Sequence, residues 1–293
     1  MSGVELFLGT TVVKVDGSEL DKLRNLLLKS PSTAEKRTTS KYESFRIGYS
    51  GGSIIGYTSG KVVITSNPAV QLVREALQKM GIKDADYDLV IGSDEAGKGE
   101  WLGPMVVTAV ALTPAQSSDL RAEGVMDSKD LSLDRIGELA HVIAKLSTAR
   151  KTVILAPDAF NALLKEFHDE GKNLNDLLAW AHAKAISQVA SELDLRSGAL
   201  QVRIVVDEFA RFKTEERLAR AIDLGSVDLI QRPHAEDEIA VAASSIVARN
   251  AREDWINEAS VRLEMNLRTL SMKEAAKRDD CNLYAKISYL RSG

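Results

Sequence analysis

Cysteine is almost absent from the chain, which contains one, Cys281. A single thiol cannot form an intramolecular disulfide, so a disulfide-stapled secreted domain is excluded, and the count fits a reducing compartment. No apolar run approaches the roughly 20 residues that a membrane-spanning helix needs. The first ten residues, MSGVELFLGT, lack the basic start and the long apolar stretch of a signal peptide. We therefore expect a cytoplasmic protein with no membrane association and an inert Cys281.

Aromatic residues make up only 5% of the chain, and positive charge is not in excess, since the formal net charge is −4. This composition is that of a soluble globular protein, and the net charge argues against a surface coated in basic patches. Residues 1–86 hold 12 Lys and Arg against 9 Asp and Glu, whereas the remainder holds 26 against 33. A chain of 293 residues suggests two domains. A mildly basic first domain and an acidic second one suit a binding module joined to an acid-rich catalytic site.

Residues 1–83 predict a small α+β domain, with its helices on one face of a sheet. We expect a strand over 4–15, a helix over 19–28, a polar loop over 31–40, strands over 42–49, 52–57 and 61–65, and a helix from residue 67 or 68 to 80. Residues 81–86 are the expected linker. The open sheet face would present some of Lys41, Arg46, Tyr49, Tyr57 and Lys61, which can stack on bases and meet phosphates. The alternative is an ordinary solvated sheet face.

Residues 84–293 predict an α/β domain, because strand-like runs alternate with helical patterns. The strands are expected near 89–91, 105–112, 153–156, 202–206 and 227–230, and the helices over 133–146, 158–167, 176–193, 215–222 and 240–251. Ser132 is expected to cap the first of these helices, and Asn173 or Asn175 the third. Residues 252–293 are expected to be mainly helical.

The stretch 87–107 carries the strongest signal for chemistry. A buried strand runs into Asp94 and Glu95, and Gly97 and Gly99 follow. Neighbouring strand residues point to opposite faces, so two adjacent acids can share a site only where the strand ends and the backbone bends. The glycines make that bend possible and let a ligand approach the main chain. The alternative is a solvated turn, whose composition would be similar.

Two further acids stand where they can join this pair. Asp207 ends the strand over 202–206, and Glu236 precedes a helix of small residues. Three or four acids that converge at strand ends form an oxygen-rich site of the kind that holds Mg²⁺ or Mn²⁺. Two such ions roughly 3.5–4 Å apart can drive phosphodiester hydrolysis. Asp207 can also be a simple turn or cap residue, and Asp237 competes with Glu236.

The eleven residues 94–104, DEAGKGEWLGP, resemble the signature of the type 2 ribonucleases H, and the step Glu100-Trp101 is more similar to ribonuclease HIII than to ribonuclease HII. The order of elements in residues 1–83 and the stretch Tyr57–Lys61 also resemble ribonuclease HIII. The resemblance implies a ribonuclease H-like catalytic domain, a mixed sheet flanked by helices, preceded by a small α+β domain like a TATA-box-binding protein.

The resemblance further implies a metal-dependent endonuclease that cuts the RNA strand of RNA–DNA hybrids and leaves 3′-hydroxyl and 5′-phosphate ends. Its four acids map onto Asp94, Glu95, Asp207 and Glu236, with Asp94 bridging two divalent ions, Mg²⁺ or Mn²⁺. The last match rests on His234-Ala235-Glu236 followed by an Ala/Ser-rich helix. The partner would be a hybrid nucleic acid, and we expect a monomer.

Substrate contacts are implied for two motifs. In the family, the backbone of Gly97-Lys98-Gly99 meets ribose 2′-hydroxyls, the group that distinguishes RNA from DNA at one site. Residues 127–131, DSKDL, resemble the family's Asp-Ser-Lys motif, in which Ser128 can donate to a phosphate and Lys129 can offset substrate charge. Ser128 can instead be a helix cap.

Two alternative functions stay open, and the histidines have still to be assigned a role. Lys98 stands where ribonuclease HIII often has a small polar residue and ribonuclease HII a basic one, so HII-like cleavage at a single ribonucleotide in DNA is one alternative. A non-catalytic hybrid-binding protein on the same fold is the other. His141, His168 and His182 show no metal-binding spacing and are interpreted as ordinary helix residues, whereas His234 stands two residues from Glu236.

Overall fold

The structure is a computed structural model that describes residues 11–80, 87–126, 129, 131–195, 200–207, 211–220, 227–232 and 235–290. It divides into two compact units. The first comprises Met1–Asp86 and Pro114–Met126, and the second comprises Tyr87–Thr113 and Asp127–Gly293. The first unit thus contains a segment that follows a strand of the second unit in sequence.

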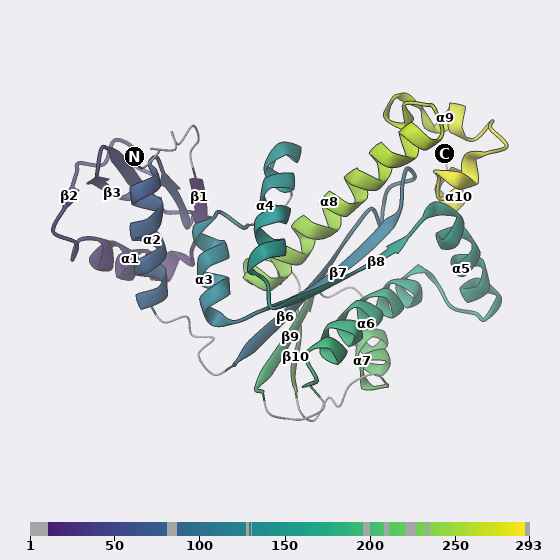
Figure 1. The fold of residues 1–293 in the computed structure, drawn as a ribbon, viewed down its shortest axis with the longest axis horizontal. Helices are drawn as coiled ribbons and strands as arrows, with labels where there is room; N and C mark the ends of the chain where they lie inside the picture. Colours follow the sequence, from purple (N-terminus) through teal and green to yellow (C-terminus); the bar gives the residue numbers. More distant parts are fainter. Residues whose placement is uncertain are drawn as a thin grey trace, which may run out of the picture. The chain divides into compact units, whose positions relative to one another are not determined.

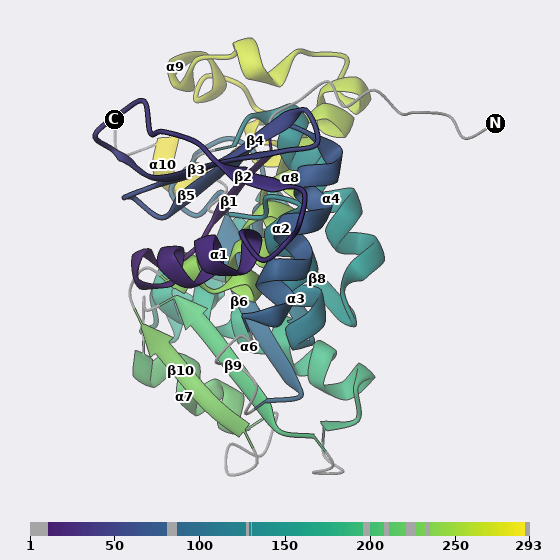
Figure 2. The same cartoon turned by 90° about the vertical axis from the view of Figure 1, so that its left-hand side faces the viewer.

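The sheet of the first unit has five antiparallel strands in the order β1-β5-β4-β3-β2 (Figure 2). These are β1 (Thr11–Lys14), β2 (Thr33–Glu35), β3 (Glu43–Tyr49), β4 (Gly52–Tyr57) and β5 (Lys61–Ile64). The expected polar loop over 31–40 is wrong in one respect, because β2 lies within it. Its three residues carry no buried side chain, so only pairing with β3, and no hydrophobic pattern, makes them a strand.

Helices cover one face of this sheet. After the turn η1 (Gly17–Glu19), α1 (Leu20–Leu27) and α2 (Asn67–Lys79) place their apolar residues, among them Leu23 and Val73, in one core with alternate strand residues such as Phe45 and Val62. The expected one-sided α+β arrangement is therefore confirmed. A helix that was not expected, α3 (Pro114–Ala122), adds Ala122 to the same core. Its buried face is made largely of serine and alanine, which gives little hydrophobic pattern to detect.

The second unit is built on a mixed five-stranded sheet in the order β10-β9-β6-β7-β8. Strands β6 (Leu89–Ala96), β9 (Val202–Asp207) and β10 (Val227–Arg232) are parallel, and β7 (Met105–Leu112) and β8 (Ala149–Leu155) complete an antiparallel edge. Every residue of β7 is buried, as expected for a strand covered on both faces.

Helices pack on both faces of this sheet (Figure 1). On one face lie α5 (Pro157–Asp169), α6 (Leu174–Glu192) and α7 (Arg211–Ala219), which contribute Phe160, Leu178 and Leu218 to the main core. On the other lies α8 (Ile239–Arg262), on which α4 (Leu133–Leu146) packs. Ser132 caps α4, and Asn173 caps α6 with a capping box, as expected.

Close packing of α8 against β6 explains a run of small residues. A Cβ added to Gly92 would lie 2.1 Å from the backbone carbon of Ala240, so only glycine fits there. The Ser244 hydroxyl donates to the Gly92 carbonyl oxygen at 2.9 Å. The predicted tight contact of this helix with a sheet is confirmed.

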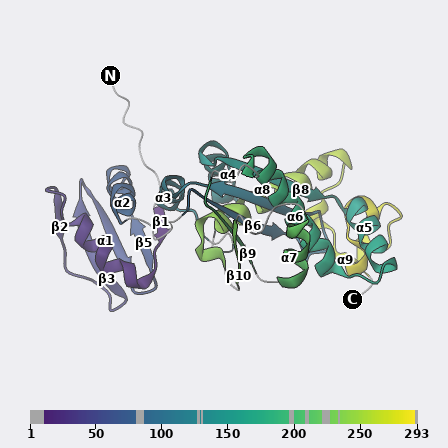
Figure 3. The same ribbon diagram turned by 90° about the horizontal axis from the view of Figure 1, so that it is seen from below.

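The expectation of a mainly helical tail was wrong beyond residue 262. There the chain forms only short pieces, namely η7 (Leu267–Thr269), α9 (Met272–Ala275), η8 (Cys281–Leu283) and α10 (Ile287–Leu290). They pack around buried Leu267, Ala275 and Tyr284, beside α5 (Figure 3). Within the described ranges, no helix has the length and apolar character to cross a membrane.

Candidate active site

Two acids meet at the centre of the mixed sheet because their strands are parallel neighbours. The register between β6 and β9 ends at the pair Ser93 and Val206. Asp94 and Asp207 are the next residue on each strand, and adjacent strands lie about 4.8 Å apart. The apolar residues before them anchor both strands in the core. The two carboxylates therefore lie where the strands emerge from the core. The expected convergence of Asp94 and Asp207 is therefore seen.

The expected end of the strand at the two acids is wrong, because β6 stays paired with β7 as far as Ala96. Since strand residues alternate, Glu95 lies on the opposite side of β6 from Asp94, facing α6. One oxygen, Oε2, is 3.1 Å from His182 Nε2, and the other, Oε1, is 3.6 Å from Lys98 Nζ. Burial would raise the pKa of this carboxyl, but the hydrogen bond and charge of His182, together with Lys98, outweigh it and lower the pKa below its ordinary value. Glu95 is thus held ionised, and its backbone N–H donates to Asp94 Oδ1 at 2.8 Å.

His182 was interpreted from the sequence as an ordinary helix residue, and this contact was missed. Its side chain is fully buried, and Nδ1 lies 2.8 Å from the Ser93 hydroxyl. One signal was available: His182 shares helical spacing with Leu178 and Ile186, so it stands on the core face of α6. A polar ring on such a face needs a polar partner.

Glycines shape the turn after the acids. Gly97 has φ +79°, and a Cβ there would lie 2.3 Å from the Pro104 carbonyl oxygen. The positive φ and the close contact both require glycine. A Cβ on Gly99 would meet nothing within 4 Å, so the backbone there faces open space, accessible to a ligand.

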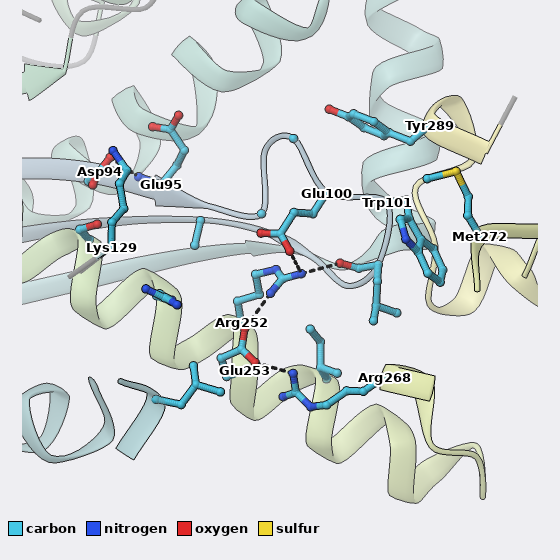
Figure 4. A pocket seen from close by; sticks show the side chains of 18 of the residues that line it. Asp94, Glu95, Glu100, Trp101, Lys129, Arg252, Glu253, Arg268, Met272 and Tyr289 are labelled. Carbon is cyan, nitrogen blue, oxygen red and sulfur yellow. Dashed lines mark hydrogen bonds and ion pairs between the residues drawn. The ribbon is translucent and has the colours of Figure 1, made fainter. Parts of the chain in front are cut away.

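A groove of about 1090 Å³ joins these features. Asp94, Glu95 and Lys129 lie toward one end of it, and Trp101, Met272 and Tyr289 toward the other (Figure 4). Asp207, Gly97 and Gly99 also line it. The structure thus brings three predicted acids and three predicted substrate-binding residues to one groove, and Lys98 joins them through Glu95.

A charged network occupies the middle of the groove (Figure 4). Arg252 pairs with Glu100 and, at 2.7 Å, with Glu253, and Arg268 pairs with Glu253 at 2.7 Å. The Arg252 side chain is only 8% exposed. It also donates to the Leu102 carbonyl oxygen at 3.0 Å, so it ties α8 to the loop that follows the glycine turn.

The donor set fits a hard cation. Asp207 Oδ1 is buried, and no described residue gives it a hydrogen bond. A buried carboxylate oxygen in that state calls for a cation or a proton. Within the described part of the chain, no three His, Cys, Asp or Glu side chains form a metal-binding group, and the side chain of Glu236 lies outside that part. The set of four acids therefore stays a prediction.

The competing acid Asp237 is exposed and forms an ion pair with Arg232, with Nη1 3.0 Å from Oδ2. This contact occupies its carboxylate. Ser128 and His234 lie outside the described residues. Glu236 follows β10 in the turn η6 (Ala235–Asp237), directly before α8.

The sequence model of the family described as Ribonuclease HII matches residues 91–276, more than half of the chain. The chain belongs to the ribonuclease HII family. A curated relative, Ribonuclease HIII of Protochlamydia amoebophila (strain UWE25), is 36% identical over 78% of this chain and 75% of its own length. Ribonuclease HIII of Chlamydia pneumoniae is 33% identical over 79% of this chain and 80% of its own.

The fold agrees with that membership. The crystal structure of Bst-RNase HIII in complex with Mn²⁺ matches 96% of this chain and 96% of its own, with a TM-score of 0.60 and 23% sequence identity. At that identity the likeness concerns the fold alone. It spans both units, so the predicted combination of a ribonuclease H-like domain with a small preceding α+β domain is confirmed.

In this member of the ribonuclease HII family, Tyr57 and Lys61 belong to the first unit. They stand next to Gly56 and Val62, whose positions face the core of that unit. Because strand residues alternate, Tyr57 and Lys61 lie on the face away from the helices. Tyr49 instead packs against the core, and Arg46 on the outer face is paired at 2.7 Å with Glu43.

Proposed function

We propose that this chain is a divalent-metal-dependent endonuclease that hydrolyses the RNA strand of RNA–DNA hybrids, in the manner of ribonuclease HIII. The observation that carries the proposal is the placement of Asp94 and Asp207 side by side, where the pairing of the parallel strands β6 and β9 ends, in one groove with the glycine turn. Membership of the ribonuclease HII family supports the same chemistry.

The acids are the proposed metal ligands. Asp94, Glu95, Asp207 and Glu236 would hold two divalent ions, Mg²⁺ or Mn²⁺, and the buried Asp207 Oδ1, to which no described residue donates, supports this role. Such ions, when bound, activate the attacking water and offset the charge on the leaving oxygen. The products would carry 3′-hydroxyl and 5′-phosphate ends.

The remaining groove residues would bind and orient the substrate. The backbone of Gly97-Lys98-Gly99, which faces open space at Gly99, would contact the ribose 2′-hydroxyl, which selects RNA over DNA. Lys98 and Lys129 would offset backbone phosphate charge beside the acids, and Ser128 would donate to a phosphate. Arg252 would keep the turn in place through its bond to the Leu102 carbonyl oxygen.

The first unit is proposed to bind the hybrid through the sheet face that its helices leave uncovered. Tyr57 would stack on a base or sugar, and Lys61 would contact a phosphate. With this role, residues 1–83 would form the substrate-binding domain and residues 84–293 the catalytic domain, apart from Pro114–Met126, which belong to the first unit.

A panel of labelled duplexes tests the proposal. One carries a single ribonucleotide in DNA, one carries a four-ribonucleotide tract, and one is a continuous hybrid, each incubated with Mg²⁺ and Mn²⁺ separately. We expect cuts within the tract and the continuous hybrid, and none at the single ribonucleotide. Cutting at the single ribonucleotide would assign HII-like specificity. Hybrid binding without any cut would refute the proposed enzymatic activity and would favour a non-catalytic hybrid-binding protein.

A further inference from the structure

One imidazole joins two alternate residues of the catalytic strand. Ser93 and Glu95 lie on the same side of β6, and His182 on α6 contacts both, at 2.8 Å through Nδ1 and at 3.1 Å through Nε2. His182 and Ser93 are completely buried. Burying a polar ring in the core of an α/β domain costs desolvation free energy, so the hydrogen-bond partners of the ring indicate its role.

Geometry defines the contact with Glu95. Nε2 lies 3.1 Å from Glu95 Oε2, within hydrogen-bond distance, and whenever the carboxylate is ionised Nε2 is the donor, since an ionised carboxylate only accepts. The Ser93 hydroxyl donates to the Thr108 carbonyl oxygen on β7 at 3.0 Å, and its oxygen lies 2.8 Å from the other ring nitrogen, Nδ1. The ring is therefore fixed at both ends, by β6, β7 and α6 together.

This arrangement separates the two oxygens of Glu95. Oε2 is directed inward to His182, while Oε1 is on the side of Lys98, 3.6 Å from its Nζ. The Glu95 side chain is 15% exposed and lines the groove, so only part of the carboxylate is accessible there.

We infer that His182 is a positioning residue that binds Glu95 Oε2 and so presents a single oxygen, Oε1, to a divalent cation in the groove. The inference rests on the proposed function. Partners that hold metal-binding carboxylates and imidazoles in place typically contribute roughly 10–100-fold to metal affinity or activity.

Three substitutions separate the contact with Glu95 from the packing of the ring. His182→Gln can keep an N–H donor near the position of Nε2, whereas His182→Asn keeps a donor only near the position of Nδ1 and is too short to reach Glu95. His182→Leu removes both donors. His141→Asn, on the exposed face of α4, is the matched control.

Two quantities are measured on each purified full-length protein. Mn²⁺ affinity of the protein without substrate is followed by electron paramagnetic resonance, and kcat and KM are measured on the continuous hybrid. We expect His182→Leu and His182→Asn to weaken Mn²⁺ binding roughly tenfold or more and to lower kcat at fixed Mn²⁺, with the hybrid KM unchanged. His182→Gln should stay within about threefold of wild type for both quantities.

The inference is overturned if His182→Asn and His182→Gln fold and behave alike, or if His182→Leu binds Mn²⁺ as wild type does. Circular dichroism establishes that each variant is folded. If none folds, imidazole NMR of the wild type decides: an exchange-protected Nε2–H of His182 that shifts on Mg²⁺ addition supports the inference, and an unprotected one contradicts it. A wild-type protein that neither binds Mn²⁺ nor cuts hybrid refutes the proposed function instead.

Discussion

The two sheets of this protein are covered differently. In the first unit, helices α1 and α2 cover one face of an antiparallel sheet, so side chains such as Tyr57 and Lys61 remain on the other. In the second, α6 and α8 cover both faces of a mixed sheet. A sheet covered on one side offers a broad surface, whereas one covered on both sides is accessible only at the ends of its strands.

This difference explains where each kind of residue lies. The acids of the second unit follow the buried runs of two strands: Asp94 and Glu95 lie among the last three residues of β6, and Asp207 is the last residue of β9. Cations and a tyrosine of the first unit lie along strands instead. We interpret the clustered acids as suited to a reaction at a single phosphodiester bond. We interpret the open sheet face as suited to contact with several nucleotides along a duplex.

The largest effect is expected from Asp94→Asn. Removing this carboxylate charge should lower hybrid cleavage by about a thousandfold or more, equivalent to roughly 4 kcal/mol in the barrier, because metal binding at the strand ends would be lost. Hybrid affinity should change little. Asp88→Asn, just before the other end of β6, is the control and should cut normally. Full activity of Asp94→Asn would refute the assigned site.

Gly92→Ala is expected to destabilise the second unit by about 3 kcal/mol. Its Cβ would lie 2.1 Å from the backbone of α8, and a helix backbone cannot relieve a clash by changing rotamer as a side chain can. Gly56→Ala in the first unit should cost less, roughly 1–2 kcal/mol, because it meets the ring of Phe45, a side chain.

Tryptophan fluorescence in urea distinguishes the two glycine variants. The three tryptophans, Trp101, Trp180 and Trp255, all belong to the second unit. Gly92→Ala should therefore lower the midpoint of the fluorescence transition, and Gly56→Ala should alter it less. The reverse order would mean that the one-sided sheet is the less tolerant of the two.

Lys286 should make stability depend on pH. Burial and the charge of Arg252, opposed in part by Glu100, lower the pKa of this lysine to about 7 from its ordinary 10.5. Between those values the unfolded chain binds more protons, so the free energy of unfolding rises with pH by at most about 1.4 kcal/mol per unit.

Lys286→Met isolates that contribution. Lys286 donates to the Gly103 carbonyl oxygen at 2.6 Å, so the variant loses this bond at every pH. The difference in unfolding free energy between wild type and variant should nevertheless change steadily from pH 7 to pH 10, in favour of wild type as pH rises, as followed by urea denaturation. A difference that is constant over this range would contradict the lowered pKa.

The smallest effect is expected on the uncovered sheet face. Lys61→Gln should raise the hybrid KM several-fold without changing kcat, and should reduce the slope of log affinity against log salt by about one. Lys29→Gln, an exposed lysine just after α1 on the helix-bearing side of the unit, is the control. Equal effects of the two substitutions would show that this face has no special role.

The elements that could be predicted are those with a strong local pattern. The runs that form β7 and β9, the caps Ser132 and Asn173 and the small-residue face of α8 are all visible as residues. The missed elements have weak patterns. Strand β2 has no buried side chain, and α3 buries serines, so pairing and packing partners decide their structure.

The candidate site divides in the same way. The local pattern of Asp94, Glu95 and the glycine turn is enough to predict a site, and the apolar run before Asp207 marks that residue as a strand end. The partner of Glu95 could not be found by spacing alone, since His182 is 87 residues away in sequence.

The sequence by itself determined which segments bury apolar residues, which apolar runs lead into acids, and which family the chain resembles, because these depend on residue type and order. Only the tertiary structure decided that β9 lies beside β6, that Arg252 secures the loop after the glycine turn, and that a buried imidazole holds Glu95. Such contacts join residues far apart in the chain, and they form only when helices and sheet exclude water together.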